Sequence, residues 1–467
     1  MLICACAVFA FGTTISARAE GKSVGEVTLT MDKGADVRLV NGNGMRFCCT
    51  ISTADYDALT EQYGEGNFSF GIFLMPKGYE TNIGAINYDN TFGESPLYIW
   101  GDGAISAVVD GKYRILHMET LPVENGDVYK MYGSVINMLD ANVGLDYVAC
   151  AYVKAGAEVK FADTTARSIV EVALRALNSG DYDAMATEKA VLNGYVETFT
   201  DNYKAANGGE EPAFDYTVRY VADGVSVGTT VVEDVEMNSG VTTRITAPSG
   251  YALNRSSIIS GYVYAKDVSV DVEVISATAI SSESDLHNKY LKESNLNYSI
   301  EDDIDCTTAT SITHNSWITA DGIIDGKGHI ITDPVIDDDI TSYGLVGARF
   351  GNGLESPAAI RDLAVVNLTN SYRNYLSYET NCGRIENCYF SGSCKYHDIF
   401  EYIYGGGVTL KNVILDCYCS VDGYALGIAG ESGAANVVYD NVIQLYDATG
   451  LHPGSTYGGT LMTYEEF

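Results

Sequence analysis

A short pattern recurs four times in the C-terminal part of the chain and restricts this part to repeat architectures. In each copy an apolar or aromatic residue is followed two positions later by Asp362, Asn387, Asn412 or Asn441, which are 25, 25 and 29 residues apart. A run of β-forming residues follows each copy. A period of roughly 20 to 30 residues with strands and glycine turns indicates a solenoid, because one coil cannot bury its own apolar face.

The repeated asparagines predict a structural role. We expect Asn387 and Asn412 to stack at an inward turn, as a ladder whose side chains bond the backbone of neighbouring coils. Residues 323–330 (IIDGKGHI) resemble the opening coil of right-handed parallel β-helix proteins, which include pectate lyases, polygalacturonases and noncatalytic adhesins. The resemblance implies a right-handed parallel β-helix over residues 276–446, with a tail at 447–467.

Short β-type runs alternate with turn signals in the first two thirds of residues 24–203, which predicts a sandwich of antiparallel strands. Apolar positions from Ile169 to Leu177 then recur at helical spacing, and Gly180 is placed to end that helix. A second, weaker helix is expected over residues 182–202. The segments GMRF (44–47), FGIFL (70–74), AYVK (151–154) and ARS (166–168) resemble an N-terminal module of secreted proteins from gut Firmicutes.

Residues 204–213 (KAANGGEEPA) have the composition of a linker. Residues 214–275 then contain short alternating strands, and the closing run VSVDVEV (268–274) has a strict period of two. The segments YTVRYVADG, APSGYALN and DVSVDVEV resemble the mucin-binding-protein-like (MucBP) and related β-grasp repeats of Gram-positive surface proteins. The resemblance implies a small β-grasp module, either a spacer or a ligand-binding module.

The first twelve residues form an apolar run that is too short to span a bilayer. Ala17 and Ala19, just before Glu20, fit a cleavage site, so residues 1–19 are predicted to be a signal peptide and the protein to be extracellular or at the cell surface. A buried N-terminal strand is the alternative. The net charge of −34 argues against nucleic acid or anionic membranes as partners. No membrane insertion is expected beyond the signal peptide.

Five of the eleven cysteines lie in one stretch of the repeat region: Cys382, Cys388, Cys394, Cys417 and Cys419. Their spacing does not match the usual zinc motifs. We therefore expect small thiols buried in the core, with disulfides as the second interpretation and a metal site as the third.

Catalytic motifs of β-helix enzymes are incomplete in this chain. The segment GRIE (383–386) is the nearest match to the R-I-K motif of polygalacturonases and lacks its lysine. A lyase would need acidic oxygens that bind Ca²⁺ and a base. The acidic candidates are residues 301–305 and Asp337, Asp338 and Asp339, and the candidate bases are Arg349, Arg361 and Lys411. Solvated loop charge is the alternative for both acidic runs, and no other cofactor is expected.

Aromatic and carboxylate side chains gather on neighbouring coils of the repeat region. Sugars bind through their CH faces on aromatic rings and through hydrogen bonds to carboxylates, so this cluster is the candidate ligand site. The candidate residues are Tyr396, His397, Asp398, Glu401, Tyr402 and Tyr418. The alternative is that several of these rings stack inside the solenoid.

Together these regions predict a mostly β, multi-domain protein that comprises a β-sandwich with two helices, a small β-grasp module and a C-terminal right-handed parallel β-helix. The expected function is noncatalytic, adhesin-like recognition of a polysaccharide or of a glycan on a host or microbial surface. A polysaccharide lyase or glycosidase acting on acidic polysaccharide is the first alternative. A passive surface stalk is the second.

Overall fold

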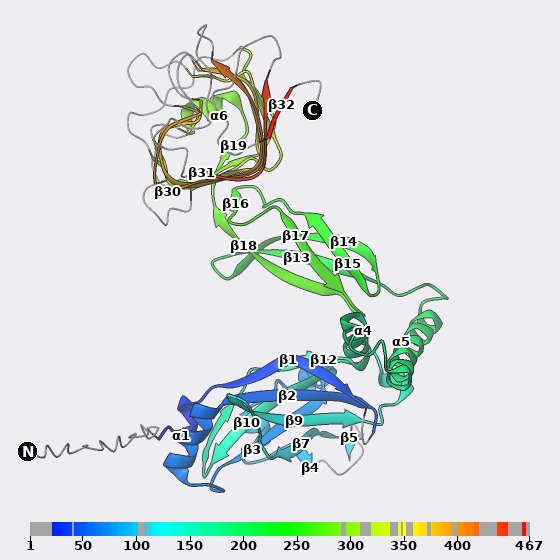
Figure 1. Cartoon of the computed structure of the whole chain (residues 1–467). Coiled ribbons are helices and arrows are strands. Elements are labelled where there is room, and N and C mark those ends of the chain that lie inside the picture. The colour runs from blue at the N-terminus through cyan, green and yellow to red at the C-terminus, as the bar shows by residue number, and fades with distance from the viewer. Residues whose placement is uncertain are drawn as a thin grey trace, which may run out of the picture. The chain divides into compact units, whose positions relative to one another are not determined.

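The computed structural model describes residues 21–39, 42–100, 108–109, 112–290, 296–308, 319–336, 344–346, 349–351, 358–370, 375–394, 399–419, 437–446 and 460–463. The fold is mostly β and divides into two compact units (Figure 1). Unit 1 takes the chain up to Phe214 together with Glu236–Ser239 and Val263–Lys266, and unit 2 takes the remainder.

Unit 1 contains two larger sheets. The first has the order β1-β2-β9-β8 and is antiparallel throughout. The second has the order β11-β10-β3-β7-β4, with β12 also on β10, and only β4 pairs in parallel. The bounds are β1 Leu29–Arg38, β2 Gly44–Ser52, β3 Ser69–Pro76, β4 Tyr98–Trp100, β7 Ile115–Thr120, β8 Val123–Asn125, β9 Val128–Ile136, β10 Tyr147–Ala155, β11 Glu158–Phe161 and β12 Thr165–Arg167, with β5 Val108–Val109 and β6 Lys112–Tyr113 as a separate pair.

The two sheets of unit 1 pack face to face. Alternate side chains of β2 and β9, such as Phe47 and Met131, share one buried core with Ile72 of β3 and Ala151 of β10. The opposite face of the second sheet buries Phe73 and its neighbours beneath the segment that carries α2 (Glu80–Ile83) and α3 (Tyr88–Thr91). Because β3 and β10 are covered on both faces, their sequences are nearly continuous apolar runs.

The predicted helix at Ile169 is confirmed as α4 (Ile169–Ser179). The Ser168 hydroxyl accepts from the Glu171 amide at its start, and Gly180 ends it in the left-handed region with φ 78°. Helix α5 (Ala186–Ala206) lies four residues later than predicted and extends into the expected linker. Helix α1 (Thr53–Tyr63) was not predicted, because it buries too few apolar residues to show a helical period.

The first part of unit 2 contains a four-stranded sheet of order β14-β13-β18-β16 and a separate β15-β17 pair. Asp223 and Gly224 turn β13 into β14 with φ 50° and 78°. Along β18 only alternate residues, Val272 and Val274, are fully buried, as the period of two requires. The bounds are β13 Ala213–Ala222, β14 Val225–Glu236, β15 Ser239–Arg244, β16 Tyr251–Leu253, β17 Ile258–Val263 and β18 Val268–Ser276.

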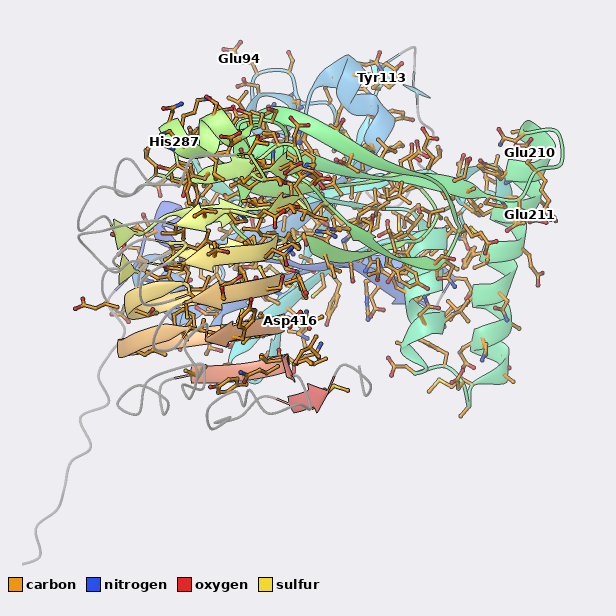
Figure 2. All side chains as sticks on the ribbon, turned by 90° about the horizontal axis from the view of Figure 1, so that it is seen from above. Glu94, Tyr113, Glu210, Glu211, His287 and Asp416 are labelled. Carbon is orange, nitrogen blue, oxygen red and sulfur yellow. The ribbon has the colours of Figure 1, made fainter. Side chains whose placement is uncertain are left out.

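A 14-stranded sheet forms the rest of unit 2, and its strands pair in parallel wherever a register is defined. Figure 1 shows β30 and β31 bent around an interior, and Figure 2 shows the strands as successive layers. The bounds are β19 Thr278–Ile280, β20 Tyr298–Ile300, β21 Ile304–Asp305, β22 Thr319–Ala320, β23 Ile323–Asp325, β24 Ile330–Thr332, β25 Val335–Ile336, β26 Arg349–Phe350, β27 Ala359–Arg361, β28 Ala364–Asn370, β29 Ser377–Cys394, β30 Phe400–Cys419, β31 Val437–Tyr446 and β32 Thr460–Thr463. Helix α6 (Glu283–Asn288) lies between β19 and β20.

The register of this sheet confirms the sequence repeat. Ile360 pairs with Ile385, Ile385 with Leu410, and Leu410 with Tyr439, so the pairing follows the 25-, 25- and 29-residue spacing. The single strand β29 pairs with β26, β27 and β28 in turn. The sheet thus consists of layers of chain that pair with the layer before and after, and we call each layer a rung. Ile360, Ile385 and Leu410 belong to one buried core, and Tyr439 packs against it.

A ladder of side chains runs along one turn of the rungs. The amide of Asn387 donates to Asp362 at 3.1 Å, that of Asn412 to Asn387 at 2.9 Å, and that of Asn441 to Asn412 at 2.9 Å. All four residues have φ between 52° and 56°, a conformation that Asn and Asp adopt more readily than most residues. The predicted ladder is present, but its orientation differs: its amides bond one another rather than the backbone, and Asn412 and Asn441 are exposed.

Replacing Asn412 by alanine is expected to lower the free energy of unfolding of unit 2 by about 1–2 kcal/mol. The change removes two side-chain hydrogen bonds, and it puts alanine in a left-handed backbone conformation with φ 52°, which asparagine tolerates better. Hydrogen exchange in peptides of β29 and β30 measures the change. Asn412→Gly removes the same bonds, but glycine adopts this backbone conformation without strain, so it should lower the free energy of unfolding less than alanine does. Equal costs would show that the left-handed backbone contributes nothing.

The cysteines whose side chains the structure describes are thiols and form no disulfides: Cys48, Cys49, Cys150, Cys306, Cys382, Cys388, Cys394 and Cys417. Cys388, Cys394 and Cys417 lie in the core of the rungs, as predicted. Burial raises the pKa of Cys388 to about 12, so its thiol stays protonated at neutral pH. Cys388, Cys394 and Cys417 thus act as small core residues.

Candidate functional site

The structure describes only part of the predicted ligand cluster. Tyr396, His397 and Asp398 lie outside the described residues, as do Asp337, Asp338 and Asp339 of the candidate Ca²⁺ site. Glu401 and Tyr402 are placed in β30, but the structure does not describe their side chains. Tyr418 is described and is 51% exposed, so this ring does not stack inside the rungs.

Tyr418 belongs to a small polar and aromatic face on consecutive rungs, which we call the rung face (Tyr389, Asp416 and Tyr418). Along β30, Val413, Leu415 and Cys417 point into the core, so Asp416 and Tyr418 lie on the opposite side. Figure 2 labels Asp416 at the side of the layered strands.

The rung face links two neighbouring rungs. Tyr389 lies in β29, and its hydroxyl donates to Asp416 Oδ2 in β30 at 3.0 Å. Burial and this carboxylate raise the pKa of Tyr389, so its hydroxyl remains a donor at neutral pH. The bond holds the Asp416 carboxylate in place next to the exposed ring of Tyr418. A ligand here would meet one ring surface and one oriented acceptor.

The acidic run at residues 301–305 is distributed over separate local contacts. Glu301 forms an ion pair with Lys327 at 2.8 Å and accepts from the Gly250 amide. Asp303 contacts His329 and the Ile330 amide, and Asp305 contacts Thr307. Within the part of the chain that the structure describes, no group of three His, Cys, Asp or Glu side chains is arranged to hold a metal ion.

The candidate bases have different surroundings. Arg361 is buried, with 3% of its surface exposed, and donates to the Arg255 carbonyl. Lys411 is half exposed and lies 3.6 Å from Asp440. The structure does not describe the side chain of Arg349. Of the two candidate bases whose side chains the structure describes, Arg361 is used inside the fold and Lys411 is reached by solvent.

Two buried carboxylates join the first rungs to residues 244–257, a segment that contains β16. Asp362 accepts from the Ser257 hydroxyl at 2.8 Å and from Arg244 at 3.3 Å, besides the amide of Asn387. Asp325 accepts from the Leu253 amide at 2.8 Å, and burial raises its pKa. We call this set of contacts the junction. The sequence did not reveal it, since Arg244 and Ser257 lie 118 and 105 positions away from Asp362.

Sequence reasoning also missed a pocket of about 450 Å³ in unit 1. Its walls come from three separate segments, namely α1, the turn into β3 with the first residues of that strand, and the end of β7 with the two residues after it. The alternating aromatics Phe68 and Phe70 beside the Glu65-Gly66 turn were the only local signal. The pocket is lined by Tyr56, Glu65, Gly66, Phe68, Ser69, Phe70, Glu119, Thr120, Leu121 and Pro122.

Among the described residues, no helix has the length and apolar character needed to cross a membrane. Neither protein-family models, nor curated proteins, nor solved structures give a match to this chain.

Proposed function

We propose that this chain is a secreted or cell-surface protein that recognises glycans without catalysis, in the manner of an adhesin. The rung face carries the proposal. In this account the parallel sheet is a right-handed, pectate-lyase-like β-helix, and residues 214–275 are a MucBP-like β-grasp module that supports it.

The chemistry of the rung face suits a sugar. A pyranose presents CH groups that pack on an aromatic ring and hydroxyls that donate to a carboxylate. Tyr418 offers the ring and Asp416, held by Tyr389, offers the acceptor on the adjacent outward position. Since rungs repeat at a constant spacing of about 4.8 Å, an extended glycan could contact several of them at once.

The junction favours a second candidate function, a passive stalk. Buried hydrogen bonds that Asp325 and Asp362 accept from Leu253 and Ser257 fix residues 244–257 to the first rungs, which gives this part of unit 2 the rigidity that a spacer needs. The same rigidity would also serve an adhesin, because it presents the rung face without flexible linkage. Ligand binding separates the two functions.

Replacing Tyr418 by alanine is expected to weaken binding to the preferred glycan about tenfold, because the ring provides the stacking surface. Glycan-array binding of the purified protein, followed by calorimetry on the best ligand, measures the effect. Tyr418→Phe keeps the ring and should retain most of the affinity. Val438→Ala, at another exposed position on β31, is the matched surface control. Unchanged binding by Tyr418→Ala would remove the rung face as the site.

A further inference from the structure

The pocket of unit 1 has the size and the walls of a small-molecule site. Its volume of about 450 Å³ lies within the range of roughly 300–1,000 Å³ that is usual for ligand pockets. The polypeptide segments that line it are fixed by the core, because Phe70 is buried between the two sheets and Tyr56 packs against the same core. It is therefore a built feature of unit 1 rather than a gap between loops.

Aromatic rings form one side of this pocket. Tyr56 and Phe68 meet edge to face at 5.6 Å between ring centroids, and Phe68 and Phe70 do so at 5.8 Å. Tyr129 stacks on Tyr56 at 4.0 Å and supports it from β9. Because these rings meet at steep angles, some ring faces as well as ring edges point into the pocket. The face of an aromatic ring carries negative potential and attracts a cation.

Carboxylates surround the same rings. Burial, followed by the charges of Glu65 and Asp57, raises the pKa of Tyr56. Burial, Glu124 and the same two carboxylates raise that of Tyr129. The described residues that line the pocket include two glutamates and no Lys, Arg or His. The site is thus negative in both its rings and its carboxylates.

We propose that this pocket binds a small organic cation with a quaternary-ammonium group, which packs on Tyr56 and Phe68 and is neutralised by Glu65. An aromatic wall beside a carboxylate is the arrangement that such cations require. An anionic ligand would be repelled. A neutral sugar can pack on the same rings and donate to a glutamate, but it leaves the negative charge of the lining glutamates uncompensated, whereas a cation compensates it.

Calorimetric titration of the purified protein with choline tests the proposal. Choline should bind, and its uncharged carbon isostere should bind at least about tenfold more weakly, since it has the same shape and no charge. Binding of choline should also weaken as sodium chloride is raised, because the glutamates are exposed. The proposal is independent of the rung face, which lies in unit 2.

The decisive variant is Glu65→Gln, which preserves shape and removes one negative charge. It should weaken choline binding about three- to tenfold. Glu94→Gln, at an exposed glutamate of unit 1 outside the pocket lining, makes the same change in net charge and should have no effect. No choline binding, equal binding of the isostere, or equal effects of the two variants would overturn the proposal. Displacement of choline by a neutral monosaccharide would reassign the pocket to sugars.

Discussion

Replacing Asp362 by alanine is expected to lower the free energy of unfolding of unit 2 by about 2–4 kcal/mol. The side chain is 2% exposed and accepts hydrogen bonds from Ser257, Arg244 and Asn387. Its removal leaves the Ser257 hydroxyl buried without this acceptor and takes away the counter-charge of Arg244. It also puts alanine in a left-handed conformation, with φ 52°.

Hydrogen exchange in peptides of β28 and β29 at increasing urea measures this loss. Asp440→Ala is the matched control, since this carboxylate is 59% exposed and lies 3.6 Å from Lys411; its removal should change stability by less than about 0.5 kcal/mol. A cost below about 1 kcal/mol for Asp362→Ala would show that the junction does not stabilise the rungs.

The second large effect concerns a buried histidine in unit 1. His117 is 2% exposed, its Nε2 lies 2.7 Å from the Tyr152 hydroxyl, and its ring stacks on Phe73 at 4.7 Å. Burial lowers the pKa of His117 to about 4. Between pH 6.5 and pH 4 the unfolded chain therefore binds a proton that the folded unit does not. Stability is lost as pH falls through this window, by roughly 3 kcal/mol in all.

Urea unfolding at pH 7 and pH 4.5, followed by the fluorescence of Trp100 in a Trp317→Phe background, measures this loss. His117→Gln is expected to be less stable at pH 7, because its amide fits the aromatic site poorly, and to lose less stability on acidification. His287→Gln removes a histidine from α6 in unit 2 and should leave the unfolding of unit 1 unchanged. The same acid loss in wild type and His117→Gln would contradict the assignment.

The features that follow from local chemistry could be predicted from the sequence. The 25-residue spacing predicted which residues stack, because Ile360, Ile385 and Leu410 occupy equivalent places in a repeat. Gly180 predicted the end of α4, since a left-handed cap favours glycine. Helix α1 gave too weak a signal because only Asp55, Ala58 and Leu59 are buried in it.

Features built from distant segments could not be predicted. The junction joins Arg244 to Asp362 across 118 positions, and no local pattern marks such a pair. The pocket of unit 1 likewise needs α1 and the end of β7 to meet. For the candidate ligand cluster, residue type suggested sugar chemistry, but only the rung register brought Tyr389 to Asp416. The other residues of the candidate ligand cluster, from Tyr396 to Tyr402, remain predictions.

One measurement tests the central claim, recognition of glycans without catalysis. The purified protein would be exposed to pectins, mucins and plant glycans, with and without millimolar Ca²⁺, and binding and released sugar would be read in the same wells. The account predicts binding to at least one glycan without release, and loss of that binding in Tyr418→Ala. Release of reducing or unsaturated sugar would contradict the noncatalytic account, and absence of both signals would favour the stalk.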